Sequence, residues 1–178
     1  MIIPLKKTKK PSHSYDHIIS GTVTIGGKTF FARSSWEANI GAYFEFLKNM
    51  GNIVDWRHEP KTFWFNGVRR GVVSYLPDFE ITENSGVVKY VEVKGYMDAR
   101  SRTKLKRMKK YYPEVVVELI DKKRYAEIAC KSHFIKNWGL LKKELIIIEN
   151  MKLKTLYWII QVILNIFTQQ GLNIFILN

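Results

Sequence analysis

Two carboxylates and one lysine have the types and spacing that suit the hydrolysis of phosphodiester bonds. Asp78 follows Pro77, and after thirteen intervening residues come Glu92, Val93 and Lys94. In a β-strand, successive side chains alternate between the two faces, so Glu92 and Lys94 would share one face and Val93 would take the other. A strand of this kind presents an acid and a base side by side.

A turn near Asn84 and Ser85 would fold two strands back on each other and bring Asp78 close to Glu92. Closely placed carboxylates repel, and a hard divalent cation relieves this repulsion by taking oxygen ligands from both. The pattern therefore predicts a site for Mg²⁺ or Mn²⁺. Such a cation acidifies its water and neutralises charge on a scissile phosphate, while Lys94 would orient the attacking water or stabilise that charge.

Glu37 is the candidate third carboxylate. Apolar residues at three- and four-residue steps predict a helix over 36–50, and Glu37 would project from its first turn. One turn later stands Gly41, which has no side chain and would leave the approach to Glu37 open. The segment Ser34-x-x-Glu37 also fits a capping box, in which Glu37 only bonds the cap amide. Both interpretations stay open.

The elements that must position these residues can be read from local patterns. Residues 22–31 alternate around Gly26 and Gly27, which predicts two short strands joined by a tight turn. The segments 54–81 and 87–93 are rich in aromatic and β-branched residues, which predicts an antiparallel meander.

A basic helix over 98–112, halted by Pro113, precedes a buried-looking strand over 115–120. A strand that arrives through a helical crossover can pair in parallel with the hairpin before it. We therefore expect an α/β (α+β) fold with a mixed central sheet flanked by helices, an N-terminal hairpin and a C-terminal helical extension. The expected divisions are a basic arm (1–20), a catalytic domain (21–130) and the extension (131–178).

The charge favours a polyanionic partner. The chain has 178 residues and a mass of 20.9 kDa, and 46% of its residues are hydrophobic, which is enough for a core. Its formal net charge at pH 7 is +13. Residues 94–124 hold eleven lysines and arginines against four acids, a net charge of +7. Such residues bind backbone phosphates without reading sequence. The candidate DNA-binding residues are Arg33, Arg100, Arg102, Lys104, Lys106 and Arg107.

These motifs resemble the PD-(D/E)XK nuclease superfamily, which has a helix glutamate, Pro-Asp and Glu-x-Lys in this order. The runs Arg33-Ser-Ser-Trp-Glu37, Tyr75-Leu-Pro-Asp-Phe79 and Val91-Glu-Val-Lys-Gly95 are similar to phage endonucleases of the endonuclease I, junction-resolving type, over about residues 29–124. The resemblance implies a restriction-endonuclease-like core and a metal-dependent endodeoxyribonuclease acting in phage recombination, repair or branched-DNA processing. The active-site residues that it implies are Glu37, Asp78, Glu92 and Lys94, with a carbonyl of Val93 on the metal.

Two other functions fit the same pattern. A transposon-end nuclease subunit has a similar arrangement of helix glutamate, aspartate and acid-x-lysine. A non-catalytic nucleic-acid-binding module could keep the fold, although binding alone does not need buried carboxylates beside phosphate. The simplest structural explanation is a surface hairpin with an ordinary contact between Glu92 and Lys94. His58 and His133 are isolated in the sequence, and we assign them no function.

The C-terminal extension is apolar. Residues 155–178 carry no charged side chain, and a run from Leu156 to Phe167 is strongly hydrophobic. A membrane span needs about 20 predominantly apolar residues, and this run is shorter and interrupted. We expect it to pack on the domain or to form a homodimer, and we regard a membrane partner as disfavoured. The single cysteine, Cys130, and the lack of a signal-peptide pattern predict a reducing, cytoplasmic location.

Overall fold

The computed structural model describes residues 19–169 and begins with a tight hairpin. Strands β1 (Gly21–Ile25) and β2 (Lys28–Ala32) pair antiparallel, and both Gly26 and Gly27 in the turn have positive φ angles. A two-residue turn of this kind needs left-handed backbone at both positions, which glycine adopts without strain. The predicted hairpin is confirmed.

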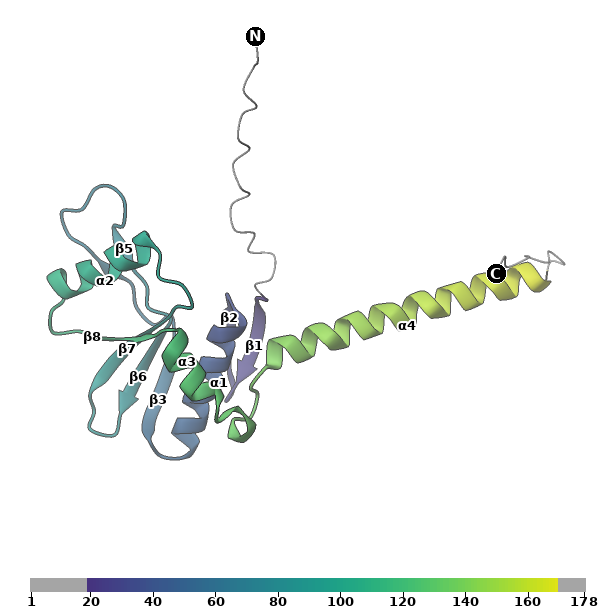
Figure 1. The fold of residues 1–178 in the computed structure, drawn as a ribbon, viewed down its shortest axis with the longest axis horizontal. Coiled ribbons are helices and arrows are strands. Elements are labelled where there is room, and N and C mark those ends of the chain that lie inside the picture. Colours follow the sequence, from purple (N-terminus) through teal and green to yellow (C-terminus); the bar gives the residue numbers. More distant parts are fainter. Residues whose placement is uncertain (1–18, 170–178) are drawn as a thin grey trace, which may run out of the picture.

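A four-stranded mixed sheet forms the centre of the molecule (Figure 1). The strand order is β3-β6-β7-β8. Its first three strands are antiparallel, whereas β8 runs parallel to β7 because the connection between them passes through helix α2. The predicted mixed sheet and the parallel last strand are confirmed. The bounds are Ile53–His58 for β3, Phe79–Glu83 for β6, Val88–Val93 for β7, Val116–Ile120 for β8 and Ala99–Tyr111 for α2.

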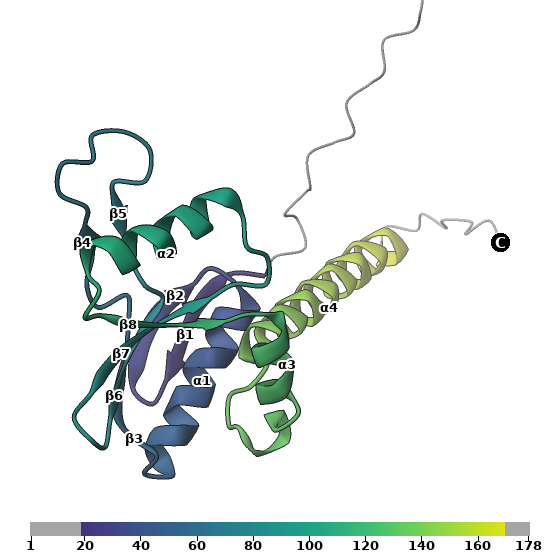
Figure 2. The ribbon, with the colours of Figure 1, turned by 60° about the vertical axis from the view of Figure 1, so that its left-hand side comes forward.

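Side-chain alternation gives the sheet two covered faces. Phe79 and Val91 belong to a first core with helix α1 (Ser35–Asn49) and the hairpin β1–β2. Tyr90, which precedes Val91 in β7, faces the opposite side of the sheet and packs against a second core that includes Met108 of α2. Figure 2 shows α1 and α2 in separate layers around the sheet. Full burial of a side chain such as Phe79 stabilises the fold by about 1.5–3 kcal/mol.

The predicted antiparallel meander is confirmed for β3, β6 and β7, but the chain between β3 and β6 leaves the central sheet. Strands β4 (Phe63–Trp64) and β5 (Ser74–Tyr75) form a small sheet of their own. Phe63 and Tyr75 are almost fully buried in the second core, beneath α2. The strands β4 and β5 therefore cover the second face of the sheet. A further strand added to the sheet edge would leave that face uncovered.

The chain after β8 continues through α3 (Lys122–Ala129), η1 (Ser132–Phe134) and the long helix α4 (Leu140–Gln169). Ile135 and Leu141 are buried in the first core, so packing of the domain continues to the start of α4. Beyond that point α4 projects away from the rest of the molecule (Figure 1). Within residues 19–169, no helix combines the length and apolar character needed to cross a membrane.

Candidate active site

Asp78 and Glu92 meet at one end of the hairpin formed by β6 and β7. The register pairs Phe79 with Val91, and one further step along both strands places Asp78 opposite Glu92. Oδ2 of Asp78 accepts the backbone N–H of Val93 at 2.7 Å. Both carboxylates are buried, with 7% and 3% of the residue exposed. The structure thus brings these two predicted residues together.

The environment of this pair disfavours two negative charges. Burial, and then the charge of Glu92, raises the pKa of Asp78 to about 7. Oε2 of Glu92 is buried and has no hydrogen-bond partner among residues 19–169. Buried carboxylate oxygens normally have partners, so an oxygen left without one beside a second carboxylate is a fitting ligand for a hard cation.

Lys94 lies on the same side as Glu92, as strand alternation predicts. Its Nζ is 3.5 Å from Oε1 of Glu92, and its side chain is one-third exposed. The backbone N–H of Lys94 donates to the carbonyl of Ile120 at 3.0 Å, which ties the end of β7 to β8. The ammonium group is therefore held near the carboxylates while it remains accessible from solvent.

Glu37 adjoins this pair, but both of its oxygens have partners of their own. Ser34 caps α1 by accepting the N–H of Glu37 at 3.2 Å. Oε2 of Glu37 accepts the N–H of Arg33 at 2.9 Å, rather than that of Ser34, so the reciprocal capping box is not formed. The charge of Glu37 nevertheless helps to raise the pKa of Asp78, although burial and the charge of Glu92 raise it more, and the bond from the N–H of Val93 lowers it.

His58 belongs to the candidate site, although its place in the sequence did not reveal this. Its Nε2 lies 2.6 Å from Oε1 of Glu37, and its ring stacks on Phe30 at 4.4 Å between centroids. His58 pairs with Phe79 in the sheet, next to Asp78, so only the strand pairing brings it into the site. Treating this histidine as isolated was wrong.

The role predicted for Gly41 is also wrong. A Cβ atom at this position would lie 2.9 Å from Cζ of Phe30, so the ring of Phe30 fills the space beside Gly41. The glycine makes room for packing between α1 and the hairpin β1–β2. It does not keep an approach to Glu37 open.

Arg33 and Glu59 lie at the edge of the carboxylate pair. Nη1 of Arg33 is 3.7 Å from Oδ1 of Asp78, and its Nη2 forms an ion pair with Glu59. Glu59 has a positive φ of 43°, which is uncommon for a residue with a side chain, and its N–H donates to the carbonyl of Asp78 at 2.9 Å. Arg33 is half exposed, so its guanidinium combines a contact with the carboxylate pair and access to solvent.

Tyr75 lies in the second core, close to Glu92. Its hydroxyl is buried and lacks a hydrogen-bond partner among the described residues. Burial, followed by the charge of Glu92, raises its pKa, so the phenol stays neutral. The Tyr75 side chain thus presents a neutral group beside a buried carboxylate without adding a charge.

The predicted DNA-binding residues of α2 differ in how they are engaged. Arg100 and Lys106 are exposed. The guanidinium of Arg102 donates to the carbonyl of Met97 at 2.6 Å, and that of Arg107 donates to the carbonyl of Val72. Lys104 lies over the ring of Tyr75. The last three therefore also hold α2 to the loops beside the site.

The acidic groups suit a cation that keeps much of its water. Among the described residues, no three His, Cys, Asp or Glu side chains are grouped so that they could hold a metal ion. Mg²⁺ binds through one or two carboxylates and retains several waters, so Asp78 and Glu92 with a backbone oxygen fit its needs. Oxygen is the only donor element that these residues offer, which suits a hard cation.

Comparison with known proteins identifies a family. A family model described as protein of unknown function (DUF1064) matches residues 18–127, more than half of the chain and all of the site described above. Comparisons with curated proteins and with solved structures give no match. By the extent of the family match, the chain belongs to the DUF1064 family.

Proposed function

We propose that this protein is a metal-dependent DNA endonuclease with a PD-(D/E)XK, restriction-endonuclease-like core. The observation that carries the proposal is the buried pair of Asp78 and Glu92 with Lys94 3.5 Å from Glu92, in a chain of net charge +13. Two buried carboxylates that repel each other make a poor structural element. They make a good site for a divalent cation beside a phosphate.

Asp78, Glu92 and the carbonyl of Val93 would hold Mg²⁺, for which Mn²⁺ would substitute. When bound, the cation would supply positive charge to the scissile phosphate and make its water more acidic. The chain prepares this site in advance, because the N–H of Val93 fixes one oxygen of Asp78 and Oε2 of Glu92 has no hydrogen-bond partner among the described residues.

Lys94 and Arg33 supply positive charge outside the carboxylate pair. Lys94 would orient the attacking water or stabilise the negative charge that grows on the phosphate. Arg33 would contact a phosphate oxygen while its ion pair with Glu59 keeps the guanidinium in place. Glu37 would tune the carboxylate pair through its charge, and His58 and the amide of Arg33 hold it in position.

The basic helix α2 would bind the DNA backbone. Arg100 and Lys106 are exposed and follow the site closely in sequence, so they can neutralise phosphates beside the cut. Binding of this kind is weakened by salt and is mostly independent of sequence. We place the activity in the cytoplasm, in phage recombination, repair or the processing of branched DNA.

A cleavage assay tests the proposal. Purified full-length protein is incubated with linear duplex, single-stranded, flap and four-way-junction DNA in Mg²⁺, in Mn²⁺ and in EDTA. We expect cuts in the presence of either metal and none in EDTA. Asp78→Ala protein, prepared in parallel, controls for contaminating nucleases.

The substrates separate the alternatives. Preferential cutting of junctions supports a junction-resolving enzyme, whereas equal cutting of linear duplex removes that assignment and leaves the nuclease. Cutting only at a specific end sequence points to a transposon-end nuclease subunit. Tight binding with no cutting of any substrate by the wild-type protein overturns the nuclease proposal in favour of a binding module.

A further inference from the structure

A hollow of about 650 Å³ lies directly beside the candidate active site, where β7, β8 and α3 meet. Lys94 belongs both to the candidate site and to the lining of this hollow. The other residues that line the hollow are Gly95, Met97, Leu119, Asp121, Lys122, Lys123 and Ala126. The hollow is shallow and widely open to solvent, and its volume falls within the 300–1,000 Å³ that is common for small-molecule sites, so it has room for one nucleotide.

The lining divides into apolar and cationic parts. Met97, Leu119 and Ala126 provide apolar surface, whereas the exposed Lys122 and Lys123 stand in the first turn of α3. Asp121 also lines the hollow, but its Oδ1 accepts the N–H of Arg124 at 2.9 Å and caps α3. A nucleotide has the matching division, with an apolar base face and an anionic phosphate.

Aromatic packing fixes the walls of this hollow. The rings of Trp36 and Tyr125 are parallel within 2° and 3.9 Å apart between centroids, which joins α1 to α3. A Cβ atom at Gly95 would lie 3.3 Å from Trp36, so the chain after β7 also packs closely on this ring. The hollow is therefore held between anchored elements and does not depend on a loose loop.

We propose that this hollow binds the nucleotide next to the scissile phosphate, with its base unstacked on the apolar surface and its phosphate on Lys122 and Lys123. The inference rests on the proposed nuclease function and specifies its substrate. A base held in stacked duplex cannot reach such a hollow without being extruded. The preferred DNA therefore has an unpaired nucleotide beside the cut, as at a flap or a branch point.

Binding of a mononucleotide tests the hollow without any cleavage. Full-length protein labelled at methionine and alanine methyl groups is titrated with thymidine 3′,5′-bisphosphate in EDTA and followed by NMR. We expect the signals of Met97 and Ala126 to shift. The double variant K122A/K123A should weaken this binding by about tenfold or more, because it removes two charge-assisted contacts to phosphate.

The matched control is K109A/K110A, which removes two exposed lysines of α2 that do not line the hollow. It should leave the affinity for the bisphosphate unchanged. Equal weakening by both double variants, or no shift at Met97 and Ala126, overturns the inference. Inorganic phosphate serves as a second probe: if it shifts the two methyl signals as much as the bisphosphate does, the hollow binds an anion only and the nucleotide proposal fails.

A cleavage measurement separates this inference from the proposed function. The substitution Ala126→Phe narrows the hollow and leaves the residues Asp78, Glu92 and Lys94 themselves unaltered. We expect the KM for flap DNA to rise severalfold while kcat stays close to that of the wild type. If wild-type protein cuts flap DNA and Ala126→Phe leaves KM unchanged, the hollow proposal fails and the nuclease survives. If the wild type cuts nothing, the nuclease proposal fails, while the NMR titration still decides whether the hollow takes a nucleotide.

Discussion

At the scale of single residues, the centre of the molecule is a pair of carboxylates that the fold buries together. Asp78 is fixed by the N–H of Val93, and Oε2 of Glu92 has no hydrogen-bond partner among the described residues. Without a cation, such a pair opposes folding when both groups are charged. The buried pair therefore lowers stability, as expected if it serves as the proposed metal site.

The raised pKa of Asp78 leads to a prediction about how the stability of the fold depends on pH. The pKa of Asp78 is about 7 in the folded protein, above its ordinary value of 3.8, so the folded state binds the proton more tightly than the unfolded state. The resulting stability is complete below pH 3.8 and is lost as the pH rises through 7. In Asp78→Asn the amide oxygen can still accept the N–H of Val93, but no charge forms.

We therefore expect the wild-type melting temperature in EDTA to fall more between pH 5 and pH 8 than that of Asp78→Asn. Thermal melting of both proteins across this range measures the difference. An identical pH dependence of the two melting temperatures would show that burial and the charge of Glu92 do not raise the pKa of Asp78.

The substitution Glu37→Gln separates a structural role of Glu37 from a catalytic one. Glutamine can still accept the N–H of Arg33 and face His58, so we expect the melting temperature to stay near the wild-type value. Loss of the charge should lower the cleavage rate by about tenfold or more, about 1.4 kcal/mol in the barrier. Melting curves beside a cleavage assay decide the matter. A variant that is both stable and fully active would remove Glu37 from the site.

At the scale of elements, Asp55 joins three parts of the first core. Oδ1 of Asp55 on β3 accepts from Lys28 of β2 at 2.5 Å and from Lys48 of α1 at 2.8 Å. Burial alone would raise the pKa of Asp55, but the bonds from Lys28 and Lys48 outweigh it and hold the pKa well below its usual range. This charge therefore ties the hairpin and helix to the edge of the sheet.

Asp55→Asn should lower the stability at pH 7 by about 1 kcal/mol or less, because these groups are partly exposed. A carboxylate with a lowered pKa contributes stability above its ordinary value of 3.8, and this contribution is lost as the pH falls. In urea denaturation, the difference between wild type and variant should therefore stay constant from pH 7 to about pH 5 and narrow as the pH falls below 3.8. A difference that stays constant with pH would mean that the ion pairs contribute nothing.

Elements with local signals could be predicted from the sequence, whereas contacts between distant strands could not. The glycine pair at Gly26 and Gly27 and the periodicity of α1 and α2 specify structure within a few residues. The excursion of β4 and β5 depends on Phe63 and Tyr75 finding the underside of α2, which no local pattern encodes.

The residues of the candidate site also differ in whether the sequence could predict that they lie together. Asp78, Glu92 and Lys94 could be predicted because one tight hairpin brings them together, and the turn that closes it lies between them in the sequence. His58 reaches Glu37 because α1 packs against β3, across 21 residues of sequence, and it reaches Asp78 through the pairing of β3 with β6. Distant pairing of this kind becomes visible only in the folded chain.

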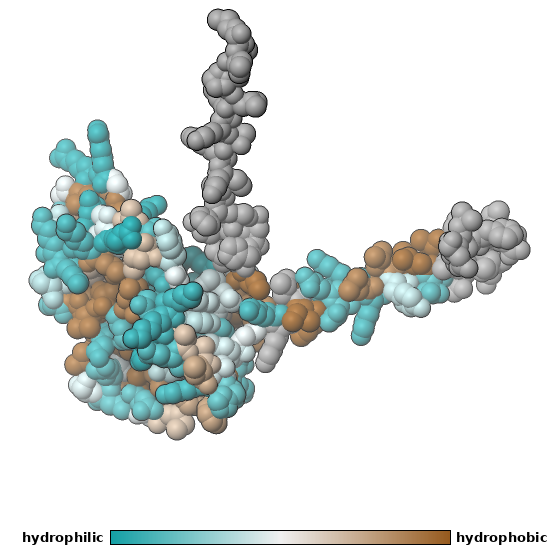
Figure 3. Space-filling model, in the orientation of Figure 1, coloured by the Kyte–Doolittle hydropathy of each residue, from teal (hydrophilic) through white to brown (hydrophobic). Residues whose placement is uncertain are grey.

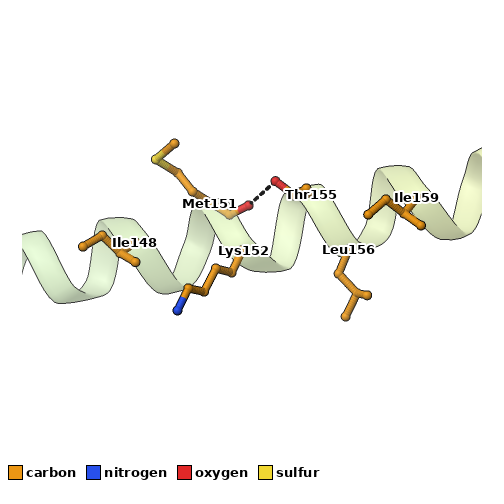
Figure 4. Close-up of a pocket in the computed structure, with 6 residues that line it drawn as sticks. All are labelled: Ile148, Met151, Lys152, Thr155, Leu156 and Ile159. Atoms are coloured by element: carbon orange, nitrogen blue, oxygen red, sulfur yellow. Dashed lines mark hydrogen bonds between the residues drawn. The ribbon is translucent and has the colours of Figure 1, made fainter.

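At the scale of the whole molecule, α4 presents apolar side chains to solvent along much of its projecting part (Figure 3). Ile148, Met151, Leu156 and Ile159 line a shallow surface on this helix, and every residue of that lining comes from α4 alone (Figure 4). Trp158 is 65% exposed. Apolar surfaces of this extent usually mark an interface, and a second copy of the chain would supply a matching one.

We therefore predict a homodimer in which α4 contributes to the contact. Truncation after Lys154 should lower the mass measured by light scattering to that of a monomer and should keep the melting transition of the domain, because Ile135 and Leu141 remain in the first core. The full-length chain at the same concentration is the control. A truncated protein of unchanged oligomeric mass would show that α4 beyond Lys154 is dispensable for association.

The most direct test of the central claim is single-turnover cleavage by Glu92→Gln, with DNA affinity measured on the same preparation. We expect the rate to fall at least about a hundredfold, which corresponds to about 2.7 kcal/mol in the barrier, because a proposed metal ligand is lost. DNA affinity should stay equal or increase, since a negative charge facing phosphate is removed. Glu83→Gln, the same change elsewhere on the β6–β7 hairpin, should retain both rate and affinity. An equal loss of rate and affinity in Glu92→Gln would contradict the account, as would a rate that does not change.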